Sequence, residues 1–224
     1  MPVRDLQPPK RQSTVEYVAD ELRGAISAGR LHQGEQLGEA ELAQHLDVSR
    51  GPLREAMQRL VAEGLLHAIR NRGVFVTELS LADVRDIYHT RAVIERAALE
   101  QVLPEAAQAT AEALQPSVAA MRTAARHGRA SAVSDADQTF HEALVEASGS
   151  PRLIRAMRTL VVESRMCLGE LETTYDDLGV QVREHGELLQ AIREGTLEPA
   201  QELLNEHMDD AVRRLVAKRV PPAS

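Results

Sequence analysis

From Leu81 onward, apolar residues recur at the spacing of amphipathic α-helices, and there is almost no alternation of the kind expected in strands. Glycines and prolines interrupt this pattern at intervals. We therefore expect six helices, over residues 80–103, 105–127, 130–148, 151–172, 176–194 and 197–218. Helices of this number and length favour a bundle.

The composition favours helices over a sheet sandwich. Aromatic residues make up 2% of the chain, with no Trp, two Phe and three Tyr, so the core has to be built from Leu, Val, Ile and Ala. At 224 residues the chain is long enough for two modest domains.

Cys167 is the single cysteine, which excludes an intramolecular disulfide and a cysteine zinc finger. The N-terminus carries charges and prolines where a secretory signal needs an apolar run, and no eighteen apolar residues occur consecutively. We expect a cytoplasmic protein that does not enter the membrane.

The pattern of the first eighty residues predicts three short helices. Residues 13–28 have helical spacing and are followed by Gly29, and a second short helix ends before Asp47, a residue type that tolerates a left-handed turn. Ser49 is suited to cap a third helix, with Pro52 in its first turn. Two helices joined by such a turn predict a helix-turn-helix.

After the third helix, two short apolar runs flank the basic segment Arg70-Asn71-Arg72-Gly73, which predicts a small β-hairpin. We therefore expect a mainly α fold. Residues 1–79 form a winged helix-turn-helix with a hairpin wing, and residues 80–224 form an all-α effector-binding and dimerisation domain of about six helices.

An acidic chain with a formal net charge of −8 nevertheless carries a local basic strip. Residues 50–72 contain five arginines and two glutamates. Arg50 and Arg54 lie near the start of the third helix, where a helix-turn-helix meets the major groove, and Arg70 or Arg72 would reach the DNA backbone or minor groove from the wing. The alternative is that these arginines are ordinary solvated charges.

The segment "LGEAELAQHLDVSRGPLREAMQRLVAEGLLHAIRNRGVFV" resembles the DNA-binding domain of GntR-type transcriptional regulators. The matching residues are Glu41-Leu42-Ala43, Val48-Ser49-Arg50, Pro52, Arg54-Glu55-Ala56, Arg59-Leu60, Glu63-Gly64-Leu65 and Gly73. The resemblance implies that Ser49, Arg50, Arg54 and the wing around Arg72 and Gly73 contact DNA. Ala40 and Asp47 depart from the family pattern, which has a basic residue and a glycine there in many members.

Four ionisable residues fall on apolar stripes of the C-terminal helices. Asp137 and His141 are four residues apart on one stripe, and His185 and His207 each lie among leucines. Burying such groups without partners is costly, and one carboxylate with three imidazoles is a ligand set for a divalent transition metal: zinc first, with nickel or manganese as alternatives. Alternatively, each histidine is a hydrogen-bonded core residue.

Arg91 falls on the inward stripe of the first C-terminal helix, together with Tyr88 and Glu95. It either pairs with Glu95 or binds a small carboxylate jointly with the metal. Arg165 and Tyr88 are further candidates for this effector pocket.

An all-helical domain after the wing, with Asp-x-x-Phe-His followed by two later histidines, resembles the metal-binding FCD-type effector domain of FadR-like GntR regulators. That resemblance implies that Asp137, His141, His185 and His207 hold the ion.

Together these features predict a transcriptional regulator without enzymatic activity, a homodimer that binds a two-fold related double-stranded DNA operator under control of a small organic acid. Residues 78–82 would be the hinge between the domains. The alternatives are a regulator that responds to the metal itself, or a metal-dependent hydrolase joined to a winged-helix interaction module.

Overall fold

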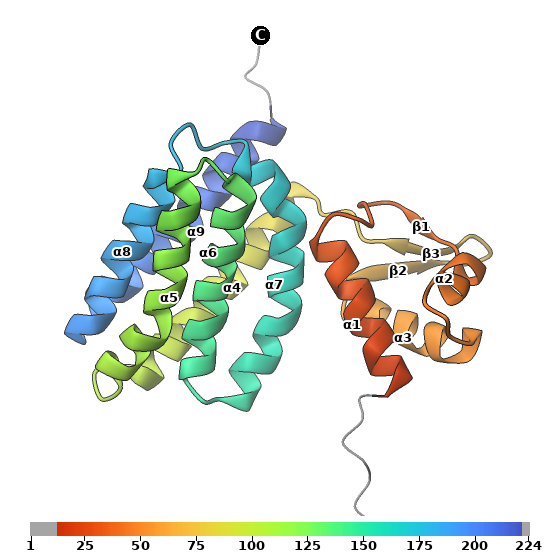
Figure 1. The fold of residues 1–224 in the computed structure, drawn as a ribbon, viewed down its shortest axis with the longest axis horizontal. Helices are drawn as coiled ribbons and strands as arrows, with labels where there is room; N and C mark the ends of the chain where they lie inside the picture. The colour runs from red at the N-terminus through yellow and green to blue at the C-terminus, as the bar shows by residue number, and fades with distance from the viewer. Residues whose placement is uncertain (1–12, 221–224) are drawn as a thin grey trace, which may run out of the picture. The chain divides into compact units, whose positions relative to one another are not determined.

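The computed structural model describes residues 13–220, apart from the side chains of residues 168–170 and 172. The chain divides into two compact units, with the boundary between Thr77 and Glu78 (Figure 1). Within the described residues, no helix is both long enough and apolar enough to cross a membrane.

The first unit contains three helices, and the turn between the second and third is the one expected from the sequence. The helices are α1 (Thr14–Ser27), α2 (Glu39–His45) and α3 (Arg50–Ala62). Asp47 adopts the left-handed conformation, with φ of 51°. Ser49 occupies the N-cap position of α3 with an extended backbone, but its side chain makes no capping hydrogen bond.

The predicted two-stranded hairpin is present, and a further strand extends it to a three-stranded antiparallel sheet. Its strands are β1 (Gln36–Leu37), β2 (Leu66–Ile69) and β3 (Gly73–Val76), in the order β1-β3-β2. The side chain of Gln36 donates to the Arg72 carbonyl oxygen at 2.5 Å, so β1 fixes the tip of the hairpin. A strand of two residues has no periodicity that a sequence pattern could reveal.

The second unit contains the six predicted helices. They are α4 (Leu81–Val102), α5 (Ala107–Arg126), α6 (Ala130–Ala147), α7 (Pro151–Glu172), α8 (Gly179–Glu194) and α9 (Leu197–Arg219). The predicted start of α8 at residue 176 was too early. Asp177 accepts a hydrogen bond from the Gly179 amide at 2.8 Å, which holds a turn before the helix begins.

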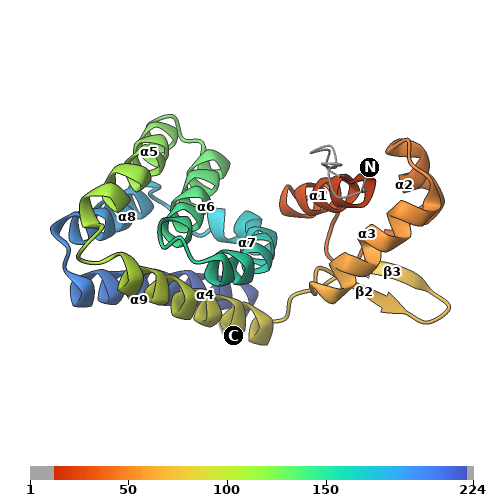
Figure 2. The same cartoon turned by 90° about the horizontal axis from the view of Figure 1, so that it is seen from below.

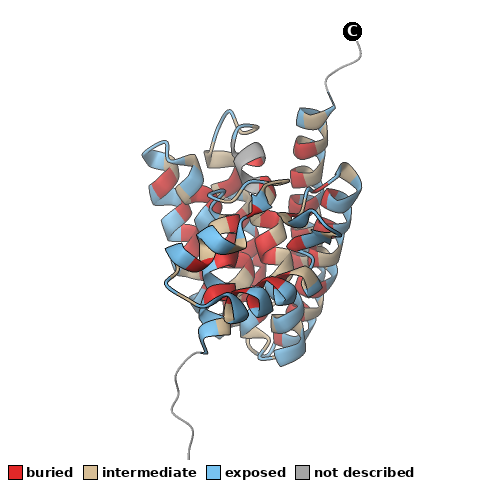
Figure 3. Ribbon diagram, turned by 90° about the vertical axis from the view of Figure 1, so that its right-hand side faces the viewer, coloured by how far each residue is buried: buried red, intermediate tan, exposed pale blue. Residues whose placement is uncertain are grey.

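The core of the second unit lies between these helices. Figure 3 shows buried residues on the inner helix faces and exposed residues outside. The core is mostly aliphatic, with Phe140 as a fully buried aromatic residue. Helices α4 and α9 lie side by side (Figure 2), and α8 packs against both α5 and α9. This packing brings one face each of α6, α8 and α9 to a common centre.

Candidate metal centre and DNA-binding surface

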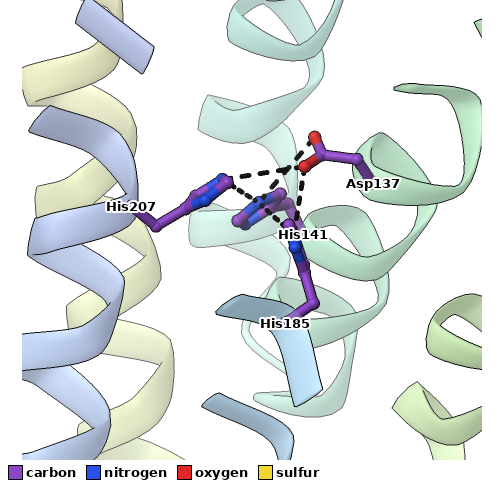
Figure 4. A group of neighbouring side chains, drawn as sticks. All are labelled: Asp137, His141, His185 and His207. Carbon is purple, nitrogen blue, oxygen red and sulfur yellow. Dashed lines mark hydrogen bonds and ion pairs between the residues drawn. The ribbon is translucent and has the colours of Figure 1, made fainter. Parts of the chain in front are cut away.

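Helices α6, α8 and α9 bring the four predicted metal ligands together. Asp137 and His141 come from α6, His185 from α8 and His207 from α9, and all four are buried. Figure 4 shows the carboxylate and the three imidazole rings pointing toward one another. One ligand atom from each residue lies within 4.8 Å of the others.

The separations between these atoms match the size of a transition-metal site. The Asp137 Oδ1 atom lies 3.0 Å from His185 Nε2 and 3.6 Å from His207 Nε2. His141 Nε2 lies 3.2 Å from His207 Nε2 and 3.4 Å from His185 Nε2. Donors placed tetrahedrally around zinc at about 2.0–2.1 Å are separated by roughly 3.4 Å. The four residues therefore fit a divalent ion.

In each ring the hydrogen-bond partner of Nδ1, the nitrogen that points away from the cluster, determines which tautomer is favoured. Nδ1 of His185 lies 2.8 Å from the Gln181 carbonyl oxygen, which can only accept, so this nitrogen carries the proton. His141 Nδ1 faces the Glu95 carboxylate at 2.5 Å, and His207 Nδ1 faces Glu184 at 3.1 Å. With Nδ1 engaged outside the cluster, each ring directs Nε2 inward. A neutral ring in this orientation offers the lone pair of Nε2 to a cation.

The electrostatics of the cluster favour an ionised Asp137 carboxylate and act in opposite directions on His141 and His185. Burial lowers the pKa of His141 to about 4, although the Glu95 carboxylate acts in the opposite direction. Burial alone would raise the pKa of Asp137, but the facing imidazoles, His185 foremost, outweigh it and hold that pKa well below its usual range. At His185, burial is likewise outweighed by Asp137, and the pKa is raised.

The carboxylates that orient two of the histidines were not predicted as site residues. Glu95 is fully buried on α4, and its side chain bridges His141 and Arg91. Burial would raise the pKa of Glu95, but His141 and Arg91 lower it further than burial raises it, so the group stays ionised. The stripe that contains Arg91 and Glu95 was visible in the sequence. The contact with His141, 46 residues away, was not.

The predicted effector residues lie in different places. Arg91 points inward as expected, with 1% of its surface exposed, and it also forms the predicted pair with Glu95. Tyr88 is buried, with its ring 5.5 Å from the Arg91 guanidinium carbon. Within the described residues, Arg165 instead pairs with Asp135 and Glu142, at 3.6 and 3.8 Å, and with none of the four candidate metal ligands, which are here called the metal cluster.

The predicted DNA-contacting residues all lie at the surface of the first unit. Ser49, Arg50 and Arg54 are exposed at the start of α3. On the wing, Arg70, Arg72 and Gly73 are exposed, and the Arg72 guanidinium lies 5.7 Å from the ring centre of Phe75. Arg54 donates from Nε to the Glu39 carboxylate at 2.6 Å, a contact that the sequence did not reveal.

A hydrogen-bonded ion pair stabilises this unit from inside. The guanidinium of Arg23, on α1, donates to both Glu63 carboxylate oxygens, at 2.9 and 2.6 Å, just after α3 ends. The hydrogen bond to Glu63, the main influence, raises the pKa of Arg23. This bidentate pair fixes α1 against α3, and so supports the helix that carries Arg50 and Arg54.

Two family models match the chain. The model described as "Bacterial regulatory proteins, gntR family" matches residues 14–76, and the "FCD domain" model matches residues 86–210, more than half of the chain.

Individual relatives and a solved structure agree with these matches. An uncharacterised helix-turn-helix regulator of Bacillus subtilis is 34% identical over 60% of each chain. A gluconate operon transcriptional repressor of Bacillus licheniformis is 27% identical over 89% of this chain and 84% of its own. A crystal structure of a GntR transcriptional regulator from Rhodococcus sp. RHA1 has a TM-score of 0.76 and 28% identity, covering 91% of this chain and 97% of that one.

These relatives are transcriptional regulators and not enzymes, which contradicts the hydrolase alternative. Along this chain the gntR-family match precedes the FCD-domain match. The chain therefore belongs to the gntR family of bacterial regulatory proteins, with an FCD domain after its helix-turn-helix domain, and is a DNA-binding transcriptional regulator.

Proposed function

We propose that a small carboxylate, bound beside a metal ion in the helical unit, controls the affinity of this regulator for its operator. The observation that carries this proposal is the convergence of three histidine Nε2 atoms and one aspartate oxygen on a buried point. Asp137, His141, His185 and His207 would hold the ion. When bound, the ion supplies a Lewis-acid position for a carboxylate oxygen. Zinc suits these donors, and nickel or manganese are alternatives.

Buried polar atoms near the cluster support an effector pocket. Within the described residues, the Tyr88 hydroxyl, Arg91 Nη2 and both amide atoms of Gln138 are buried without a hydrogen-bond partner. Arg91 Nη2 lies 3.2 Å from Glu95, within ion-pair range but outside hydrogen-bond geometry. Leaving such groups unpaired costs about 1–3 kcal/mol each. A carboxylate would accept from Arg91, and the Tyr88 hydroxyl would donate to it.

A basic groove beside this region supports an anionic effector. The pocket between α4 and α9 has a volume of about 480 Å³, and Tyr88 forms part of its wall. Its charged and ionisable lining comprises Arg85, His89, Arg96 and Asp209. Because two arginines and one aspartate give this lining a net positive charge, it attracts anions and raises their local concentration. The Bacillus licheniformis relative is named for the gluconate operon, and gluconate is a carboxylate.

On the DNA side, we propose that two copies of the chain pair and place their α3 helices in successive major grooves of a two-fold related site. Arg54 would read base edges, and Arg50, Arg70 and Arg72 would contact the backbone or minor groove. Ser49 and Gly73 would approach the phosphates closely. Pairing two half-sites raises affinity through effective concentration.

Effector binding and operator binding would be coupled through α4 and α9. Glu95 bridges Arg91 and the metal-cluster residue His141, so a carboxylate at Arg91 competes for one partner of this bridge. Arg219, on the α9 helix that carries His207, donates to the Leu79 carbonyl oxygen at 2.6 Å. Leu79 lies two residues beyond the unit boundary, within the predicted 78–82 hinge. Coupling requires that the effector bind two arrangements with different affinities.

The test is operator affinity of the metal-loaded protein across a panel of small carboxylates that includes gluconate, citrate and lactate. At least one should change the affinity of the wild-type protein. Arg91→Gln should raise the effector concentration needed by at least about tenfold, because a charge-assisted hydrogen bond is lost. Arg122→Gln, an exposed change on α5, should not. If no carboxylate shifts operator affinity, the carboxylate assignment fails.

A second candidate signal is the metal itself, and one pocket favours it. The opening between α8 and α9 has a volume of about 360 Å³ and reaches the metal-cluster residue His207. Its carboxylate lining consists of Glu184, Glu187, Glu206 and Asp210. Such a lining attracts cations and would let the ion exchange with solvent. This candidate predicts operator affinity that follows free metal with no organic acid present, measured by titrating zinc in a buffered series.

A further inference from the structure

Glu39 fixes the side chain of Arg54 before any DNA is bound. Glu39 is the first residue of α2 and Arg54 is in the second turn of α3, so the contact joins the two helices of the helix-turn-helix. The Arg54 Nε atom donates to Glu39 Oε2 at 2.6 Å.

Stability alone does not account for this pair. The side chains of Arg54 and Glu39 are 61% and 35% exposed, and ion pairs at such positions contribute little to folding. An arginine side chain, however, loses considerable rotamer entropy when it is immobilised. A contact that restricts Arg54 in the free protein therefore reduces the entropy lost at the DNA.

The contact leaves the recognition end of the guanidinium open. Among the residues that the structure describes, Glu39 is the partner of Arg54, and only Nε is engaged. The two terminal nitrogens stay available for the bidentate contact that arginine makes with guanine O6 and N7. Arg50, one turn earlier on α3, has no ion pair within the described residues, so the two arginines differ in how strongly they are held.

We propose that Glu39 is a positioning residue that sets the base selectivity of the operator contact by fixing Arg54. This inference rests on the proposed base-reading role of Arg54. Its chemistry predicts opposite effects on two kinds of DNA binding. A carboxylate close to the phosphates weakens sequence-independent binding by repulsion, whereas a fixed Arg54 strengthens discrimination between bases. Glu39 therefore lowers sequence-independent affinity for DNA and raises selectivity for the operator bases.

The experiment measures affinity of the full chain for two duplexes by fluorescence anisotropy. One duplex is the consensus selected by the wild-type protein from a random library, and the other is a scrambled sequence of the same composition. The Glu39→Ala variant should bind scrambled DNA more tightly. Its selectivity ratio, the affinity for the consensus duplex divided by the affinity for the scrambled duplex, should be about tenfold lower than that of the wild-type protein, a coupling typical of contacting residues. Glu39→Gln keeps an acceptor for Arg54 Nε and should restore part of the ratio.

Two comparisons separate positioning from charge. Glu41→Ala removes the same charge from an exposed position on α2 and should strengthen binding to both duplexes equally. In an Arg54→Ala background, Glu39→Ala should leave the ratio unchanged. The inference is overturned if Glu39→Ala behaves like Glu41→Ala, or if it lowers the ratio equally without Arg54. If Arg54→Ala alone leaves the ratio unchanged, the base-reading role itself fails, and the inference fails with it.

Discussion

At the scale of single residues, Glu95 has two partners with different proposed roles. One oxygen accepts from Arg91 Nε at 3.3 Å, and the other faces His141 Nδ1 at 2.5 Å. A carboxylate in this position fixes the tautomer of the histidine and raises the basicity of its opposite nitrogen. Glu95 thereby links the proposed effector residue to the metal cluster.

Replacing Glu95 by Gln should weaken metal binding by about 10–100-fold, the usual effect of losing a partner behind a metal-bound histidine. Competition against a chelator of known affinity measures this change. Glu100→Gln, at an exposed position on the same helix, is the matched control and should leave the affinity unchanged. Equal metal affinity in Glu95→Gln and wild-type protein would show that Glu95 does not support the site.

The four metal-cluster residues could be predicted because each falls on an apolar stripe, where burial of an ionisable side chain costs free energy unless the side chain has a partner. Their partners could not be predicted in the same way. Glu184 and the Gln181 carbonyl precede His185 on α8, yet Glu184 orients the distant His207. Such contacts depend on how helices pack, which the periodicity of one helix does not specify.

At the scale of elements, helix ends were predicted well where a residue dictates the backbone. Gly195 ends α8 with φ of 72°, a conformation that glycine adopts without strain. Asp47 makes the corresponding turn before α3. Strand β1 was missed because its pairing with β3 is a long-range property, with Gln36 opposite Phe75. Local conformational preference is thus readable from the sequence, whereas pairing between distant segments is not.

The packing of α7 against the start of α4 makes stability depend on pH. Burial, with Asp83 and Asp86 nearby, raises the pKa of Glu163 from its ordinary value of 4.5 to about 7. The folded state therefore binds a proton that the unfolded state has released between those values, so stability falls as pH rises from about 4.5 to about 7. Above pH 7 the half-buried carboxylate is ionised and destabilising.

Glu163→Gln should therefore raise the unfolding temperature relative to the wild-type protein at pH 8, and the difference should shrink at pH 5. Thermal unfolding followed by circular dichroism at both pH values measures this effect, with pH 5 as the internal reference. A difference that is the same at both pH values would argue against a raised pKa at Glu163.

In the whole molecule, the two units would have separate functions: the first would bind DNA and the second would bind the metal ion and the effector. The first presents arginines at α3 and the wing, and the second buries the Asp137 cluster among α6, α8 and α9. Ser80 and Asp83 form a reciprocal capping box at the start of α4, directly after the boundary. That cap gives α4 a defined beginning.

Control of DNA binding by this regulator would depend on a metal ion in the buried cluster. The most direct test is the metal content per chain of freshly purified protein, prepared without chelator or histidine tag, beside a His185→Ala/His207→Ala variant. We expect about one transition-metal ion per wild-type chain, and its loss in the variant. Wild-type protein free of metal, even after zinc, nickel and manganese have been offered, would contradict it.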